Sequence, residues 1–328
     1  MPRNESIIHS MTEPKPQQST QQIVVIAEPI ASAPRAWLAS RAQVIEASHT
    51  NPDSFFTALA NANALVIRTY TKIDQALLDR APNLRVIARA GVGLDNIDLD
   101  ACQTQGVTVV HTPSANTHAV VEYVTQLMLT SLREIKVIEG PLPQRDWHDL
   151  REQAISNRSC VGATLGIIGH GKIGSALALV ARALQMNVII HDIDPTQAQS
   201  IPLEELAAAS DVISIHVDGR ASNHHALSSS FFDLLKPNTI LINSSRGFVI
   251  DEQAAAAFAI ANPAAQLIFD VHTPEPIEAD SPLNNIANVV RTPHIAAATK
   301  DAKEAMSWVV RDVIKVLNNQ EPIHRALP

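Results

Sequence analysis

The chain has 328 residues, of which 46% are hydrophobic and 18% charged, and its formal net charge is −8. This balance excludes disorder for the bulk of the chain, because disordered chains have few apolar and many charged residues. The acidic charge, without a run of Lys or Arg, excludes an electrostatic footprint for nucleic acid or an anionic membrane. No stretch approaches the roughly 20 apolar residues that span a bilayer. The length predicts about two domains.

The first 22 residues contain no apolar segment of the kind that a signal peptide needs. Their Pro, Gln, Ser and Thr content predicts a disordered tail over 1–22. The only two cysteines, Cys102 and Cys160, form no CxxC pair and allow at most one disulfide. Both stand beside apolar neighbours, which favours reduced thiols in a cytoplasmic protein. We expect no metal site.

Short runs rich in Val and Ile recur along the chain and alternate with Ala- and Leu-rich stretches of helical spacing. Runs of four to seven apolar residues without alternation are typical of strands buried on both faces. The first half contains runs at 23–27, 43–47, 64–68, 85–89 and 107–111, and the second half at 164–169, 187–192, 211–217, 239–243, 266–271 and 288–291. This alternation predicts an α/β protein with two doubly wound parallel sheets.

A helical pattern over 117–139 joins the two halves and is longer than an ordinary globular helix. We expect it either to bridge two domains or to contribute to a subunit interface. Further helices are predicted over 175–185 and 203–210, and a C-terminal helix over 301–317.

Five of the eleven glycines fall within 162–174, although glycine is sparse elsewhere. They include a GxGxxG motif, Gly169, Gly171 and Gly174, between an apolar run and a helical pattern. In this context the glycines permit a tight turn, close approach of a pyrophosphate and close helix packing, and the helix N-terminus attracts the phosphate charge. The next predicted strand ends in Asp192, where a carboxylate binds a ribose 2′-OH and repels a 2′-phosphate. The sequence therefore predicts NAD rather than NADP; a simple connecting turn, with Asp192 as a helix cap, is the weaker alternative.

Three later strands end near residues suited to catalysis, namely Arg246, Glu275 and His294. Because ligands of open α/β sheets bind outside the carboxyl ends of the strands, we expect all three near the cofactor. A guanidinium can hold a carboxylate and polarise the adjacent carbonyl. A histidine can exchange the proton that accompanies hydride transfer, and a nearby glutamate fixes its tautomer. Taken singly, each residue is more simply an ordinary surface or loop residue, but their joint occurrence favours catalysis.

Five motifs extend this pattern: RAGVGLDNIDLDA (89–101), GIIGHGKIG (166–174), LINSSRG (241–247), FDVHTPEP (269–276) and VVRTPHIAAAT (289–299). Over about residues 60–320 the chain resembles the D-isomer-specific 2-hydroxyacid dehydrogenases, and among them the phosphoglycerate dehydrogenase branch. The resemblance implies that Arg246 binds the substrate carboxylate and carbonyl, and that Glu275 pairs with the acid/base His294. It implies that NAD lies among the glycine turn and Lys172, Ile173, Asp192, His216, Val217, Ser244, Ser245, Asp270, Ala296 and Ala297.

The resemblance also implies substrate-binding backbone amides at Ala90, Gly91, Val92 and Gly93, on a loop that Asp95 and Asn96 shape. In the phosphoglycerate branch, arginines at the positions of Arg68 and Arg89 help to hold a phosphate, although both are equally well ordinary strand-end residues.

The resemblance further implies a discontinuous, flavodoxin-like substrate-binding domain, 23–118 plus 300–328. A Rossmann NAD-binding domain, 119–299, is inserted into it, and an active-site cleft between them closes by hinge motion. No regulatory domain follows residue 328, so feedback through such a domain is not expected.

These features predict an NAD-dependent oxidoreductase that transfers hydride between NAD(H) and a D-2-hydroxy acid or 2-oxo acid. The preferred pair is 3-phosphoglycerate and 3-phosphohydroxypyruvate, and hydroxypyruvate or glyoxylate reduction is the alternative. A corepressor-like protein that senses NAD(H) without catalysis would keep the same residues. Formate oxidation is a weaker prediction, because formate enzymes of this superfamily place glutamine where Glu275 stands. Family analogy favours a homodimer around 117–139, and a tetramer stays open.

Overall fold

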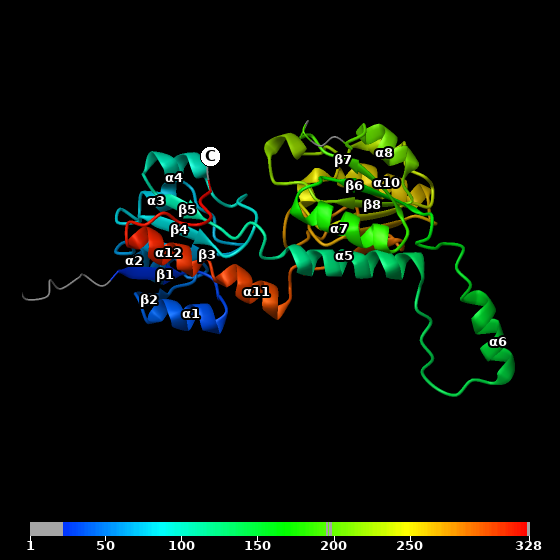
Figure 1. The fold of residues 1–328 in the computed structure, drawn as a ribbon, viewed down its shortest axis with the longest axis horizontal. Coiled ribbons are helices and arrows are strands. Elements are labelled where there is room, and N and C mark those ends of the chain that lie inside the picture. The colour runs from blue at the N-terminus through cyan, green and yellow to red at the C-terminus, as the bar shows by residue number, and fades with distance from the viewer. Residues whose placement is uncertain (1–21, 195, 197–198, 327–328) are drawn as a thin grey trace, which may run out of the picture.

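The computed structural model describes residues 22–194, 196 and 199–326, so most of the tail predicted over 1–22 lies outside it. It contains two separate parallel sheets (Figure 1). The first has the order β2-β1-β3-β4-β5, which is the flavodoxin-like order. Its strands are β1 (Ile23–Ile26), β2 (Gln43–Glu46), β3 (Ala64–Ile67), β4 (Val86–Arg89) and β5 (Thr108–Val110).

The second sheet has six parallel strands in the order β11-β10-β9-β8-β6-β7. They are β6 (Thr164–Ile168), β7 (Asn187–His191), β8 (Val212–Ile215), β9 (Ile240–Asn243), β10 (Gln266–Phe269) and β11 (Val289–Arg291). A parallel bridge between Ile190 and Ser200 adds a further short pairing beyond β7. With it the sheet has the Rossmann order, which reverses between β6 and β8. All eleven predicted strands are confirmed.

Helices cover both faces of each sheet, as buried parallel strands require. On the first sheet, α1 (Ser32–Ala39) and α12 (Val310–Leu317) cover one face, and α2 (Pro52–Leu59), α3 (Gln75–Leu78) and α4 (Leu99–Thr104) cover the other. On the second sheet, α5 (Thr117–Leu132) and α7 (Lys172–Ala183) pack opposite α8 (Leu203–Ala209), α9 (Ser229–Phe232) and α10 (Glu252–Ala261). The chain therefore returns to its first sheet at the C-terminal end.

The single helix predicted over 301–317 is wrong, because the chain forms α11 (Lys300–Ser307) and then α12. The two helices bury different faces. Met306 of α11 packs beside Ala119 at the start of α5, whereas Val310 and Val313 of α12 pack on the first sheet. The turn at Trp308 lets each helix reach its own partner.

The long helix predicted over 117–139 is also wrong, because α5 ends at Leu132. Its buried side chains pack on α7 and β9, and Leu132 is the last of them. Ile135 and Ile138 continue the apolar spacing but are 73% and 42% exposed, since no core lies beneath them. A helical extension without tertiary packing is marginal in water.

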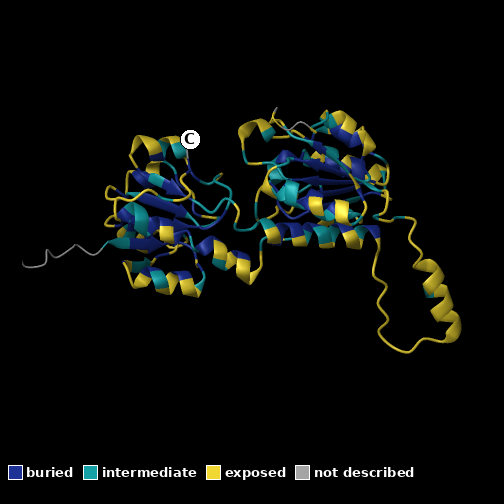
Figure 2. Ribbon diagram, in the orientation of Figure 1, coloured by how far each residue is buried: buried dark blue, intermediate teal, exposed yellow. Residues whose placement is uncertain are grey.

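Residues 133–158 form an arm that extends away from the second sheet (Figures 1 and 2). The arm carries α6 (Gln144–Gln153), which the sequence analysis missed and of which no residue is buried. Several of its apolar side chains are exposed, namely Ile135, Val137, Ile138, Leu142, Trp147 and Ile155. None of the described helices is long and apolar enough to cross a membrane.

Candidate active site

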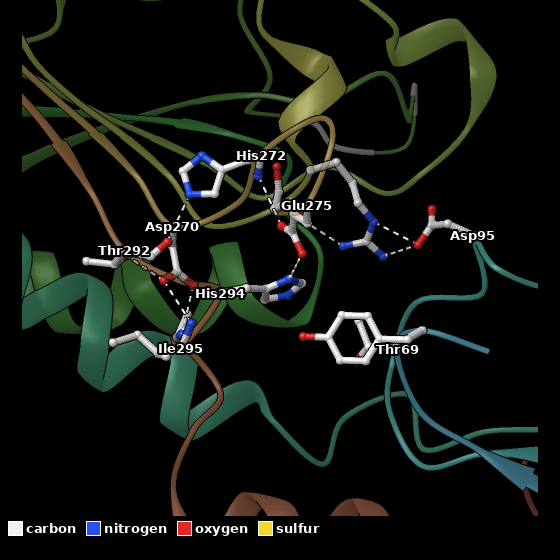
Figure 3. A network of polar contacts seen from close by, with 12 residues as sticks. Thr69, Asp95, Asp270, His272, Glu275, Thr292, His294 and Ile295 are labelled. Carbon is white, nitrogen blue, oxygen red and sulfur yellow. Dashed lines mark hydrogen bonds and ion pairs between the residues drawn. The ribbon is translucent and has the colours of Figure 1, made fainter. Parts of the chain in front are cut away.

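A histidine–carboxylate pair lies at the carboxyl edge of the second sheet, as the sequence predicts (Figure 3). Nδ1 of His294, which follows β11, is 2.9 Å from Oε2 of Glu275, which follows β10. Oε1 of Glu275 accepts a 3.0 Å hydrogen bond from the backbone N–H of His272. Because Nδ1 is engaged by Glu275, Nε2 is the ring nitrogen that can exchange a proton with a ligand.

Hydrogen bonds keep Glu275 ionised. Burial of the carboxyl opposes ionisation, but the bonds from the His294 ring and from the His272 N–H outweigh it and lower the pKa of Glu275 below its ordinary value. An ionised carboxylate can only accept hydrogen bonds. Glu275 therefore keeps a proton on Nδ1 of His294 and fixes the tautomer of the ring.

The loop that carries His294 is fastened by Asp270, which is 1% exposed. Its carboxylate accepts hydrogen bonds from Thr292 Oγ1 at 2.6 Å, Ile295 N at 2.9 Å and Ala296 N at 2.8 Å (Figure 3). His294 itself has φ of 55°, an uncommon conformation for a non-glycine residue. The Asp270 side chain, expected beside NAD, thus holds the strained catalytic loop.

Arg246 lies in the loop between β9 and the 3₁₀ turn Gly247–Val249, and it reaches across to the first domain. Its Nε and Nη2 lie 2.8 and 2.6 Å from Oδ2 of Asp95, which follows β4. Its Nη1 donates to the Ser245 carbonyl at 2.7 Å. Figure 3 shows the Asp95 carboxylate facing the part of the second domain that carries Glu275 and His294. Residues of both domains therefore meet at the candidate site.

Asn243, to which the sequence analysis gave no role, shapes the loop that carries Arg246. Its buried Oδ1 accepts from the N–H and the hydroxyl of Ser245 at 3.0 and 2.9 Å, and its Nδ2 donates to the Arg246 carbonyl at 2.9 Å. The Ser245 hydroxyl, expected near NAD, is therefore satisfied within the loop. The hydroxyl of Ser244 is buried and has no partner among the described residues, as a ligand contact would require.

The glycine turn sits where the strand order of the second sheet reverses. Gly169 has φ of +93°, and a Cβ there would lie 2.5 Å from the His216 carbonyl at the end of β8. A Cβ on Gly174 would lie 2.1 Å from the Gly169 carbonyl, so helix α7 packs directly on the turn. No described atom lies within 4 Å of a Cβ placed on Gly171. This open face at the N-terminus of α7 fits the pyrophosphate of a dinucleotide.

Asp192 is tied to the same turn. Its Oδ2 accepts the N–H of His170 at 2.5 Å, and its Oδ1 accepts that of Asp194 at 2.9 Å. The carboxylate therefore lies at the end of β7 beside the open turn, where a ribose would bind.

The other predicted cofactor residues surround this point. Lys172 is exposed at the first position of α7, and Val217 is half-buried after β8. The His216 ring lies 2.8 Å from the Ser214 hydroxyl, and burial lowers its pKa to about 4. Ala296 is buried in the core of the second domain, and the half-buried Ile173 and Ala297 pack against that core.

The loop Ala90–Gly93 is held by residues that the sequence analysis missed. Thr112 donates its N–H and hydroxyl to the Gly91 carbonyl at 3.0 and 3.1 Å, and His111 Nδ1 lies 2.9 Å from the Val92 carbonyl. Two arginines pass directly over the glycines. A Cβ on Gly91 would lie 2.0 Å from Nη1 of Arg89, and one on Gly93 would lie 1.9 Å from Nη2 of Arg246.

Arg89 is a half-buried cation, and no described residue forms a hydrogen bond with its guanidinium. Its Nε has no hydrogen-bond partner in the described part of the chain. Burial, followed by the nearby charge of Arg246, lowers its pKa to about 10, so it is still charged at neutral pH. Arg68 makes a long 3.4 Å contact from Nη1 to the Pro29 carbonyl.

Glu28, another residue that the sequence analysis missed, fixes the loop that follows β3. It is 7% exposed, and its carboxylate accepts hydrogen bonds from the backbone N–H groups of residues 68–71 and from the Thr71 hydroxyl, at 2.9–3.2 Å. Burial opposes its ionisation, but these bonds lower the pKa of Glu28 below its ordinary value. The loop of Arg68 is thus rigidly placed at the edge of the first sheet.

Comparison with known proteins places this geometry in one family. The model of the NAD-binding domain of D-isomer-specific 2-hydroxyacid dehydrogenases matches residues 125–296. D-3-phosphoglycerate dehydrogenase of Archaeoglobus fulgidus is 31% identical over 312 residues, which cover 93% of this chain but 59% of that protein. The chain therefore spans little more than half the length of this relative.

Two further proteins match over more than three quarters of both chains. (S)-sulfolactate dehydrogenase of Chromohalobacter salexigens is 35% identical over 269 residues, 78% of this chain and 84% of that protein. The crystal structure of the TT0316 protein from Thermus thermophilus superposes with a TM-score of 0.82 at 27% identity, covering 93% of this chain and 100% of that one.

The hydrogen bonds of Glu28 to the loop after β3 should make a pH-dependent contribution to the stability of the folded protein. In Glu28→Gln a side-chain amide replaces the carboxylate and faces the N–H donors of residues 68–71. The free energy of unfolding should therefore fall by about 2 kcal/mol. Since the folded pKa of Glu28 is depressed, its contribution is complete above the unfolded pKa and is lost as the pH falls through the folded pKa. Denaturant unfolding should therefore separate the variant from the parent at neutral pH and bring them together in acid. Glu46→Gln, at an exposed ion pair with Arg35, is the control and should change little. A difference that persists undiminished in acid would contradict the assignment.

Proposed function

Since the chain belongs to the D-isomer-specific 2-hydroxyacid dehydrogenase family and contains its NAD-binding domain, we propose that it interconverts a D-2-hydroxy acid and its 2-oxo acid. The observation that carries the proposal is the 2.9 Å His294–Glu275 pair at the carboxyl edge of the second sheet. The Asp95–Arg246 contact brings the first domain to the same edge. The proposed substrate domain is 23–118 plus 300–328, and the NAD domain is 119–299.

The residues of the second domain fit the cofactor. The open turn at Gly169–Gly171 and the N-terminus of α7 would hold the pyrophosphate, and Asp192 the adenosine ribose. The partnerless Ser244 hydroxyl offers a further contact. When bound, NADH supplies the hydride.

The chain's own residues then complete the reduction. Arg246 orients the substrate carboxylate and stabilises the negative charge that develops on the carbonyl oxygen. As hydride adds to the carbonyl carbon, the oxygen takes up a proton from Nε2 of the His294 imidazolium. Glu275 stabilises that imidazolium, and in the oxidising direction Nε2 accepts the proton back. Approach of the two domains would exclude water from the hydride-transfer step.

We further propose that the substrate carries a second anionic group, as 3-phosphoglycerate and 3-phosphohydroxypyruvate do. Arg89 supports this, because its buried Nε has no partner in the described part of the chain, and leaving a buried polar group unpaired is costly unless an anion joins it. Two relatives are named for acids with a second anionic group, a phosphate and a sulfonate. Reduction of hydroxypyruvate or glyoxylate is the alternative.

Removing the acid/base should stop catalysis without weakening cofactor binding. For His294→Ala we expect kcat to fall roughly 10²–10⁴-fold, the usual contribution of general acid–base catalysis. The dissociation constant of NADH, measured by fluorescence, should not change. Glu275→Gln should lie between parent and alanine variant, because it keeps a hydrogen-bond acceptor but loses the charge. Turnover of the alanine variant near the parent rate would remove His294 from the mechanism.

A substrate panel tests the second anionic group. NADH oxidation should be faster with 3-phosphohydroxypyruvate than with hydroxypyruvate, glyoxylate or pyruvate. In Arg89→Gln the KM for the phosphorylated acid should rise about 10–100-fold, as expected for a lost hydrogen bond to a charged group. The KM of the same variant for hydroxypyruvate is the internal control and should be unaffected. Equal effects on both acids would argue for a structural Arg89. Tight NADH binding without turnover of any acid would favour a corepressor-like sensor.

We propose that the protein is a homodimer joined through the arm, residues 133–158. Isolated helices as short as α6 are marginal in water, and none of its residues is buried against another described part of the chain. A second copy offers each arm a surface in a closed two-fold arrangement. We also propose a cytoplasmic location, which the free thiols of Cys102 and Cys160 support.

Light scattering of variants in α6 tests the dimer. Trp147 is 46% exposed, and Trp147→Ser should shift the mass from two chains to one, since it removes the largest apolar side chain of the arm. Asp149→Ser, on the opposite side of the helix, is the matched control and should leave the dimer intact. If the parent protein has the mass of a single chain, the proposal is contradicted. A mass of four chains would identify a tetramer.

A further inference from the structure

Asp95 makes the closest contact between the catalytic arginine and the first domain, over a separation of 151 residues. We propose that Asp95 is a positioning residue: it orients Arg246 for the substrate and ties that orientation to the approach of the two domains. The inference rests on the proposed function, in which Arg246 binds the carboxylate of the 2-oxo acid.

The hydrogen-bond count of Arg246 supports a positioning role. A guanidinium has five N–H donors. Nε donates one hydrogen bond to Oδ2 of Asp95 and Nη1 donates one to the Ser245 carbonyl, while Nη2 lies 2.6 Å from the same Asp95 oxygen as an ion-pair contact. One donor each on Nη1 and Nη2 is left for a ligand. Because the guanidinium is planar, the two hydrogen bonds and the ion-pair contact fix the direction of these two donors, and two such donors match a carboxylate.

Close packing on both sides keeps Asp95 in this place. A Cβ on Gly219, in the loop after β8, would lie 1.2 Å from Oδ1 of Asp95. A Cβ on Gly93 would lie 2.7 Å from its Oδ2. The carboxylate therefore fits against bare backbone from both domains. The next residue, Asn96, anchors the loop by donating to the Thr71 carbonyl at 2.7 Å.

Asp95 also supplies the charge that lets two arginines share the site. Arg246 depresses the pKa of Arg89, after the larger effect of burial, whereas Asp95 raises it. Without Asp95, the two guanidinium groups would repel each other in a partly buried region. Arg246 would then keep only the Ser245 carbonyl as a hydrogen-bond acceptor, and it would lose the negative charge that attracts it to this position.

The domain origin of the two partners gives the contact a second consequence. Arg246 belongs to the second domain and Asp95 to the first, so the arginine has its full set of bonds only when the domains lie together. Domain approach would thus complete the substrate-binding geometry, in addition to excluding water.

The test compares Asp95→Asn and Asp95→Ala with Asp98→Asn in steady-state reduction of the preferred 2-oxo acid. We expect kcat/KM to fall about 10–100-fold in the Asp95 variants, with the larger loss in alanine, as for bonds to a charged group. The dissociation constant of NADH should stay at the parent value, which a general loss of structure would not allow. Asp98 caps α4 in the same loop, and asparagine is an equally good cap, so Asp98→Asn should match the parent.

Calorimetric binding of oxalate to the NADH complex provides a readout that needs no turnover. Weaker oxalate binding in both Asp95 variants, in proportion to the loss of kcat/KM, supports the positioning role. Unchanged binding and turnover would overturn it, as would tighter binding, which would make Asp95 a competitor of the substrate. If the parent reduces no 2-oxo acid, the proposed function fails, and oxalate binding still decides the role of Asp95.

Discussion

The loop that carries His294, at the carboxyl edge of the second sheet, depends on the carboxylate of Asp270. Where a parallel strand ends, the next backbone N–H groups lose their ladder partners, and buried ones must find another acceptor. Asp270 supplies it for Ile295 and Ala296 and so fixes the loop on which His294 stands. Glu28 does the same at the edge of the first sheet, for residues 68–71. In both domains a buried carboxylate thus accepts the hydrogen bonds of the loop that follows a strand and holds that loop rigid.

These hydrogen bonds explain why reactive side chains can be placed accurately on loops. His294 keeps a left-handed backbone because Asp270 holds both of its sides. Arg246 keeps its place because Asn243 closes its loop. Each half of the site is therefore held by contacts within its own domain. The two halves meet at Arg246 and Asp95.

The sequence predicted features that local patterns encode. Buried parallel strands read as apolar runs, and the glycine turn has a fixed spacing, so the eleven strands and the turn at Gly169 were found. Contacts between distant segments leave no local signal: Glu28 lies 40–43 residues from its partners, and Asp95 lies 151 from Arg246. The same limit explains the error at α5. The apolar spacing continues through Ile135 and Ile138, but only the position of the sheet decides that the helix stops at Leu132.

Arg89 has no hydrogen-bonded carboxylate beside it because the two nearby carboxylates bind other groups. Glu28 and Asp95 are the carboxylates that raise the pKa of Arg89, so both lie within electrostatic reach. Yet Glu28 satisfies the N–H groups of its loop, and Asp95 binds Arg246, so neither gives Arg89 a hydrogen bond. The Arg89 guanidinium over the Gly91 loop is therefore left without a hydrogen-bonding carboxylate in the described part of the chain. An anionic group of a ligand would satisfy it, which is why the contacts that build the site support the proposal of a substrate with a second anionic group.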